Sequence, residues 1–237
     1  MATYFISDLH LSGERPVIIG HFIDFLQQQA PQAEALYILG DLFELWIGDD
    51  AMPPDLEPAV KALTRLSNTG VPIYVMRGNR DFLIGDEFAK ITGCTLLEDP
   101  TIIDLYGQST LLMHGDTLCT DDVDYQLFRQ QVRDPAWQAE YLAKPVDERL
   151  AMAKQARQIS EARTKEKPED IMDVNSEAVE NTFQQYQVSQ IIHGHTHRPA
   201  IHELVVDSKK VKRIVLGDWY TQKSILKTDT DGYLLLE

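Results

Sequence analysis

Five times along this 237-residue chain, a short apolar run stops abruptly at residues with carboxylate, amide or imidazole side chains. Short apolar runs bounded by polar turns are typical of buried β-strands. The run at 35–39, for example, ends in Gly40 and Asp41. The repeated pattern predicts strands that each deliver polar side chains to a loop at their C-terminal end, so that several loops together build one site.

The five polar motifs have the composition of metal ligands. In chain order they are Asp8-Leu9-His10 after 3–7, Gly40-Asp41 after 35–39, Gly78-Asn79-Arg80-Asp81 after 71–76, His114-Gly115-Asp116 after 110–113, and His193-Gly194-His195-Thr196-His197 after 188–192. In an extended chain, residues two apart point to the same side. We therefore expect Asp8 and His10 to face one pocket, and His195 and His197 likewise, while His193 supports the structure.

The strand ends contribute two carboxylates, one amide and four imidazoles, namely Asp8, His10, Asp41, Asn79, His114, His195 and His197. Oxygen and nitrogen ligands without thiolate suit Mn²⁺, Fe²⁺, Zn²⁺ or Co²⁺. These ligands are too many for one catalytic ion with an open position, so we expect two ions that share the carboxylate of Asp41. Two ions about 3.5–4 Å apart can hold a hydroxide and stabilise the oxygens of a phosphoryl group. Arg80 can contact the same phosphate in a bidentate manner.

The rest of the chain alternates between helical and strand patterns. Helical periodicity predicts helices over 16–29, 56–68, 84–92 and 174–186, and the last stretch predicts antiparallel strands over 200–206, 211–216, 223–227 and 232–236. Asp49 and Asp50 are expected in a solvated loop or a helix cap. The polar, helical region 122–170 predicts an insertion that covers the strand ends, and the alternative is a plain helical hairpin packed on the core.

Composition narrows the partners and the location. The formal net charge of −15 argues against DNA or RNA as a partner, because nucleic-acid-binding proteins usually carry a basic patch. The N-terminus has no basic residues ahead of its short apolar run, and no stretch approaches the roughly 20 apolar residues of a membrane span. We expect a cytoplasmic protein with at most peripheral membrane contact, whose Cys94 and Cys119 stay reduced.

The motifs D-x-H, GD, GN-x-D, HGD and GH-x-H resemble those of the calcineurin-like metallophosphoesterases, and the resemblance covers nearly the whole chain. It implies an α/β (α+β) fold, a four-layer β-sandwich flanked by helices, in a single domain 1–237 with a helical insertion 122–170 that caps the active site. It also implies that one metal is held by Asp8, His10, Asp41 and His197, and the other by Asp41, Asn79, His114 and His195. The catalytic residues implied are Asp41, Asn79, Arg80 and His114.

Longer strings resemble a narrower family, the UDP-2,3-diacylglucosamine diphosphatases of lipid A biosynthesis. They are 5–11, 36–43, 46–50, 78–83, 113–122, 171–175 and 193–199. The resemblance implies hydrolysis of the substrate's pyrophosphate to UMP and 2,3-diacylglucosamine 1-phosphate, two Mn²⁺ per chain, and peripheral attachment to the cytoplasmic face of the inner membrane; it sets no oligomeric state. The substrate contacts implied are Asn79, Arg80, Asp122, Ser160, Thr164, Lys167 and His195.

Two features depart from that family. Thr164 replaces an asparagine that is common there, and the insertion is less apolar between Trp137 and Ile159 than a segment that meets acyl chains and membrane should be. These departures count against strong membrane attachment and not against the chemistry. One alternative keeps the site and changes the substrate to a cyclic nucleotide or a dinucleotide. A second alternative, a non-catalytic scaffold, predicts lost ligands, whereas every ligand position is filled.

Overall fold

The computed structural model describes residues 1–166, 173–220, 223–230 and 232–236, with 161–166 described by their backbone alone. Its strands form two mixed sheets. The first has the order β11–β10–β1–β2–β3–β4 and contains β1 (Ala2–Ile6), β2 (Ala33–Leu39), β3 (Ile73–Met76), β4 (Thr95–Leu97), β10 (Ile225–Asp229) and β11 (Gly232–Leu236). The second has the order β5–β6–β7–β9–β8 and contains β5 (Thr101–Leu105), β6 (Gln108–Leu112), β7 (Gln190–His193), β8 (Ala200–Val206) and β9 (Lys209–Val215).

The middle of each sheet is parallel, and this arrangement positions the site. Strands β1 to β4 pair in parallel, as do β6, β7 and β9, whereas β10, β11, β5 and β8 are antiparallel to their neighbours. Parallel neighbours end at the same edge of a sheet, where α/β proteins bind their ligands. The loops after the two sheets also meet, because the His195 amide, after β7, donates a 2.9 Å hydrogen bond to Asp8 Oδ2, after β1.

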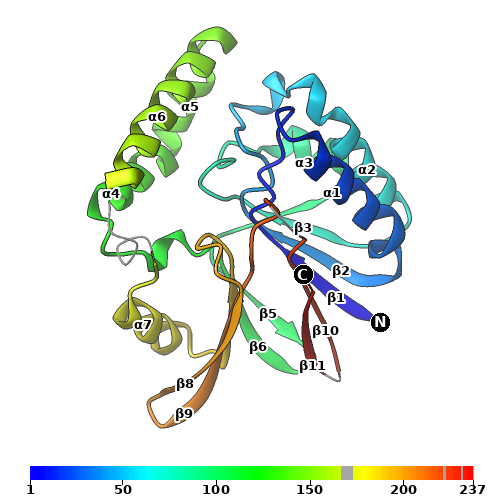
Figure 1. The fold of residues 1–237 in the computed structure, drawn as a ribbon, viewed down its shortest axis with the longest axis vertical. Coiled ribbons are helices and arrows are strands. Elements are labelled where there is room, and N and C mark those ends of the chain that lie inside the picture. Colours follow the sequence, from blue (N-terminus) through cyan, green and yellow to red (C-terminus); the bar gives the residue numbers. More distant parts are fainter. Residues whose placement is uncertain (167–172, 221–222, 231, 237) are drawn as a thin grey trace.

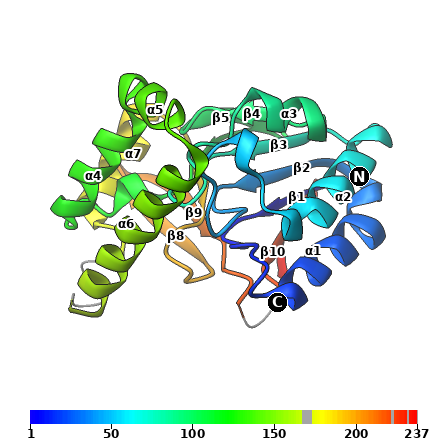
Figure 2. The ribbon, with the colours of Figure 1, turned by 90° about the horizontal axis from the view of Figure 1, so that it is seen from above.

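Four layers follow from the alternation of side chains along the strands. Tyr4 and Ile6 pack with α1 (Pro16–Gln28), α2 (Glu57–Asn68) and α3 (Asp86–Thr92) on the outer face of the first sheet. Phe5 points the other way, into the core between the two sheets. Phe183 of α7 (Ser176–Tyr186) packs on the outer face of the second sheet. Figures 1 and 2 show these helices outside the strands, and the predicted four-layer sandwich is confirmed.

The region 122–170 forms three helices in the part that the structure describes: α4 (Val123–Arg133), α5 (Pro135–Leu142) and α6 (Val146–Glu166). Two of them begin at aspartates that accept hydrogen bonds from the first turn, Asp122 from the Tyr125 amide and Asp134 from the Trp137 amide. Figure 1 shows α4 to α6 together on one side of the molecule and α1 to α3 on the other. The predicted helical character is confirmed up to residue 166.

A few local predictions need correction. Strand β4 was not predicted, because three residues are too few to show a period. Strand β9 pairs in parallel with β7 as well as antiparallel with β8, so the last stretch is not purely antiparallel. The helix-cap prediction for Asp49 is confirmed, although the helix is distant in sequence, since its carboxylate accepts hydrogen bonds from the Gly85 and Phe88 amides at the start of α3. Cys94 and Cys119 are free and buried, as expected.

None of the helices in the described ranges is both long enough and apolar enough to cross a membrane.

Candidate metal centre

The loops that carry the predicted ligands turn through an unusual backbone conformation. Positive φ values occur at five of the predicted ligand positions, namely Asp8 (54°), His10 (48°), Asp41 (52°), His195 (68°) and His197 (56°). A side chain in this left-handed region costs roughly 1–3 kcal/mol at each position and persists only where the surroundings impose it. The surrounding structure therefore holds these loops in a demanding shape, and such strain is concentrated at functional sites.

The same backbone angles correct one step of the sequence argument. Strand β1 ends at Ile6 and β7 ends at His193, so Asp8 and His10 do not lie on an extended strand, and neither do His195 and His197. The side chains do converge, but left-handed turns direct them rather than strand alternation.

Glycines without room for a side chain let these loops approach one another. A Cβ on Gly78 would lie 2.1 Å from Asp41 Oδ1, and a Cβ on Gly194 would lie 2.3 Å from Asp8 Oδ2. Gly40 has a φ of 91°, and a Cβ there would lie 2.4 Å from His114 Nδ1. The glycines of the polar motifs are thus part of the site's construction.

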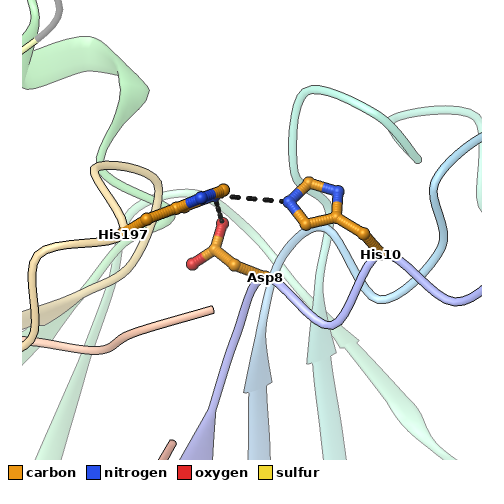
Figure 3. A group of neighbouring side chains, drawn as sticks. All are labelled: Asp8, His10 and His197. Carbon is orange, nitrogen blue, oxygen red and sulfur yellow. Dashed lines mark hydrogen bonds and ion pairs between the residues drawn. The ribbon is translucent and has the colours of Figure 1, made fainter. Parts of the chain in front are cut away.

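One group of side chains consists of Asp8, His10 and His197, drawn in Figure 3. The Nε2 atoms of His10 and His197 face each other at 3.3 Å, and His197 Nε2 lies 3.4 Å from Asp8 Oδ1. Among the described residues, the fully buried Asp8 Oδ1 has no hydrogen-bond partner. Buried carboxylate oxygens normally have such a partner, and a cation bound between these three side chains would supply it.

A second group lies on the other side of Asp41. Asn79 Oδ1 is 2.9 Å from His114 Nε2 and 3.0 Å from His195 Nδ1. Asp41 Oδ1 lies 3.8 Å from His114 Nε2, while its Oδ2 lies 3.8 Å from His10 Nε2. The two oxygens of one carboxylate therefore face the two groups, which is the placement that a shared ligand requires.

Asp8 also lies between the groups. Ligand atoms of Asp8, Asp41 and His114 all come within 4.8 Å of one another, as do those of Asp8, His10 and His197. The structure thus brings all the predicted ligand positions together, and it places two buried carboxylates rather than one at the centre.

Hydrogen bonds from behind orient several of these side chains. His114 Nδ1 lies 2.9 Å from the Leu39 carbonyl, which leaves its Nε2 directed into the site. Asp8 Oδ2 accepts hydrogen bonds from the Ser7 hydroxyl at 2.5 Å and the His195 amide at 2.9 Å. The Arg80 amide donates to Asp41 Oδ1 at 2.8 Å. Among the described residues, one oxygen of each carboxylate therefore accepts more hydrogen bonds than the other.

Burial sets the charge of two of the imidazoles. Desolvation lowers the pKa of His10, which is buried, to about 3 and the pKa of His195, which is partly exposed, to about 4. Both are therefore neutral at pH 7, and neutral imidazole is the form that binds a metal ion.

The other two imidazoles pair with carboxylates. Burial lowers the pKa of His114, but the charge of Asp41 outweighs it and raises that pKa to about 9. Burial likewise opposes a charged His197, yet its contacts with Asp218 and Asp8 raise its pKa to about 10. Where no cation balances these carboxylates, protons on the two histidines do so, and a divalent cation would displace them.

The sequence comparisons place the chain in a family. Residues 1–199 match the family model described as calcineurin-like phosphoesterase. The chain belongs to the calcineurin-like phosphoesterase family. The resemblance seen in the five motifs is thereby confirmed, and the family is hydrolytic and metal-dependent.

Curated relatives within this family are similar over their whole length. A protein of Stenotrophomonas maltophilia named UDP-2,3-diacylglucosamine hydrolase is 52% identical over 99% of this chain and 98% of its own. A protein of Xanthomonas campestris pv. campestris with the same name has the same identity and coverage. A solved structure of an archaeal phosphodiesterase is 14% identical, with a TM-score of 0.47, and covers 100% of both chains.

The structure describes the side chains of two of the four substrate contacts that were predicted in the insertion. Asp122 is the N-cap of α4, and Ser160 is exposed on α6. Thr164 lies on α6, where the backbone alone is described, and Lys167 falls outside the described residues. Their contacts with substrate stay predictions.

The insertion reaches the site through residues that sequence reasoning missed. Asp116 of the HGD motif is buried and accepts hydrogen bonds from the Tyr125 hydroxyl at 2.6 Å and from Arg129 Nε at 2.8 Å, both on α4. The Tyr125 ring lies 6.0 Å from that of His195. Arg133, further along α4, donates to the Gly78 carbonyl at 2.9 Å. The spacing of Tyr125, Arg129 and Arg133 by four residues was the available signal, since it puts all three on one helix face.

Proposed function

We propose that this chain hydrolyses the pyrophosphate bond of UDP-2,3-diacylglucosamine to give UMP and 2,3-diacylglucosamine 1-phosphate in lipid A biosynthesis. The proposal is carried by the arrangement at Asp41, whose two oxygens face two groups of metal-type side chains. The 52% identity to relatives named UDP-2,3-diacylglucosamine hydrolase supports the choice of substrate.

The donor set fits two divalent transition-metal ions, and we assign Mn²⁺ to both. Asp8, His10, Asp41 and His197 would hold one, and Asp41, Asn79, His114 and His195 the other. Two observations support this assignment: Asp8 Oδ1 has no hydrogen-bond partner within the described ranges, and the Nε2 atoms of His10 and His197 face each other. When bound, such ions supply Lewis acidity and a water of lowered pKa.

Side chains at the edge of the metal site supply the remaining chemistry. The Arg80 side chain is 29% exposed and follows directly on Asn79, which supports a role in which its guanidinium binds the non-bridging oxygens of the phosphoryl group. Both products of the cleavage are phosphomonoesters, which are stable as anions, so the chain needs no strong acid to protonate the leaving group. Oriented donors around the reacting phosphorus are the main requirement.

We further propose that residues 1–237 form one domain in which residues 122–170 act as a lid. Exposed apolar side chains on its helices, including Leu127, Phe128 and Ile159, would meet the acyl chains or the surface of the membrane. Asp122, Ser160, Thr164 and Lys167 would contact the substrate. On this proposal the enzyme works in the cytoplasm, at the inner face of the inner membrane.

The test is an assay of the purified, Mn²⁺-loaded protein with UDP-2,3-diacylglucosamine. Release of UMP together with 2,3-diacylglucosamine 1-phosphate is the expected result. The deacylated nucleotide sugar is the matched control, because a substrate pocket that meets acyl chains should turn it over far more slowly. Equal rates on both, or a preference for cyclic nucleotides or dinucleotides, would assign the site to another phosphodiester.

A further inference from the structure

A second cluster of charged side chains borders the site, centred on Glu44. This glutamate follows β2 by a few residues, and its side chain is 9% exposed. Arg157 Nη1 of α6 donates to Glu44 Oε1 at 2.5 Å, Arg15 Nη2 donates to Oε2, and Arg80 Nε lies 3.9 Å from Oε1. Three separate parts of the chain thus bring a guanidinium to one buried carboxylate.

The cluster is continuous with the His10 side of the metal centre. Glu44 Oε2 lies 3.6 Å from His10 Nδ1, and Arg15 Nη2 also donates to the His10 carbonyl at 2.9 Å. The Tyr220 ring stacks on His10 at 5.3 Å and also lies against the Arg15 guanidinium, at 4.4 Å. A ligand atom held by these arginines would therefore be a close neighbour of one held by His10.

The cluster has more cationic donors than a structural ion pair needs. The side chains of Arg15, Arg80 and Arg157 are 28%, 29% and 36% exposed, so Glu44 lies behind groups that solvent can reach. In the described part of the chain the Arg80 guanidinium forms no hydrogen bond, and 3.9 Å from Glu44 is too long for one. In a chain with 22 basic and 37 acidic residues, three arginines gathered on one glutamate form a local cationic patch.

We propose that Glu44 is a positioning residue that gathers Arg15, Arg80 and Arg157 into an anion site for a second phosphoryl group. The metal ligands take one phosphoryl group of a diphosphate, and the arginines bind the oxygens of the adjacent one through charge-assisted hydrogen bonds. This deepens the proposed function and rests on it for the identity of the substrate, but the selectivity for a diphosphate over a single phosphate is a property of the site itself.

The experiment measures the affinity of the Mn²⁺-loaded protein for inorganic phosphate and for methylenediphosphonate, a diphosphate analogue that cannot be hydrolysed, by calorimetric titration. Arg15→Met and Arg157→Met should each weaken diphosphonate binding by about tenfold, the loss of one charge-assisted contact. Phosphate binding should stay within about twofold, because the proposal gives Arg15 and Arg157 no contact with the phosphoryl group at the metal ligands. Arg157→Lys should fall between wild type and Arg157→Met, since it keeps the charge without the planar fork.

The Glu44→Gln variant separates two possible roles of Glu44 by the direction in which the diphosphonate affinity changes. Removal of a negative charge beside an anion should strengthen binding if Glu44 acts by its charge alone, whereas loss of a positioning residue should weaken diphosphonate binding by about threefold or more. A gain in diphosphonate affinity would overturn the proposal. So would equal losses for both ligands, or no loss in the two arginine variants.

Asp50→Asn is the matched control. Asp50 pairs with Arg149 of α6 and so also ties the insertion to the core, but it takes no part in the Glu44 cluster. It should leave both affinities unchanged, and equal losses in this variant would show that the effect comes from loosening α6. If wild type releases no UMP from the lipid substrate while the diphosphonate results hold, the proposed function fails and the anion site stands.

Discussion

Gly78→Ala offers a sharp test of how the loops build the site. The added Cβ would lie 2.1 Å from Asp41 Oδ1 and 2.3 Å from the Asp41 backbone nitrogen, whereas ordinary contacts begin at 3.4 Å. Because one of these atoms belongs to the backbone, the two loops must separate by about 1 Å. A displacement of about 1 Å at reacting groups can lower the rate by about 10²-fold.

The assay compares kcat/KM and Mn²⁺ affinity of Gly78→Ala with those of wild type, alongside the thermal unfolding midpoint. Both activity and metal affinity should fall while the protein stays folded. Gly20→Ala is the matched control, since it makes the same chemical change within helix α1, where nothing lies within 4 Å of the new Cβ. It should keep full activity and raise the free energy of unfolding by about 0.5–1 kcal/mol. Wild-type kinetics in Gly78→Ala would refute the close approach of the two loops.

Three further outcomes follow from the site. Asp41→Ala should lower turnover by about 10³-fold or more, because both groups of side chains lose the carboxylate between them, and circular dichroism should show the fold retained; unchanged turnover would contradict a shared ligand. Arg80→Ala should lower kcat/KM by roughly 10- to 100-fold, the loss of a charge-assisted contact to phosphate, and a wild-type value would remove that role. Metal binding at pH 7.5 should release more than one proton, because the pKa values of His197 and His114 are raised to about 10 and about 9. Calorimetry in buffers of different ionisation enthalpy measures the number of protons released. Both histidines are protonated below those values, so apparent metal affinity should rise from pH 7 to pH 9, and affinity independent of pH would contradict these pairings.

The sequence predicted which residues meet at the site. An apolar run indicates a buried strand, and the metal-type residue directly after it indicates which side chain lies at the end of that strand. The sequence could not predict how these residues meet. Left-handed turns at Asp8 and His10 direct these side chains. Aspartate and histidine adopt a positive φ more often than most residues, but a single sequence does not show at which positions they do so. The helices were predictable for a similar reason, since α1 buries Phe22 and Phe25 at helical spacing.

The supporting contacts were not predictable, because each joins residues that are far apart in the chain. Glu44 looks like an ordinary polar residue after a strand until α6 brings Arg157 to it. Asp218 follows β9 without any motif, yet it lies 3.2 Å from His197 Nδ1. The position of the insertion depends on such ion pairs, and periodicity within one helix does not encode its partners on another.

The central claim is that the strand-end side chains bind two metal ions that share Asp41. Anomalous scattering at the manganese edge from crystals grown with Mn²⁺ tests it directly. The account predicts two peaks, one among Asp8, His10 and His197 and one among Asn79, His114 and His195, with an oxygen of Asp41 on each. A single ion, or two ions that do not both contact Asp41, would contradict it.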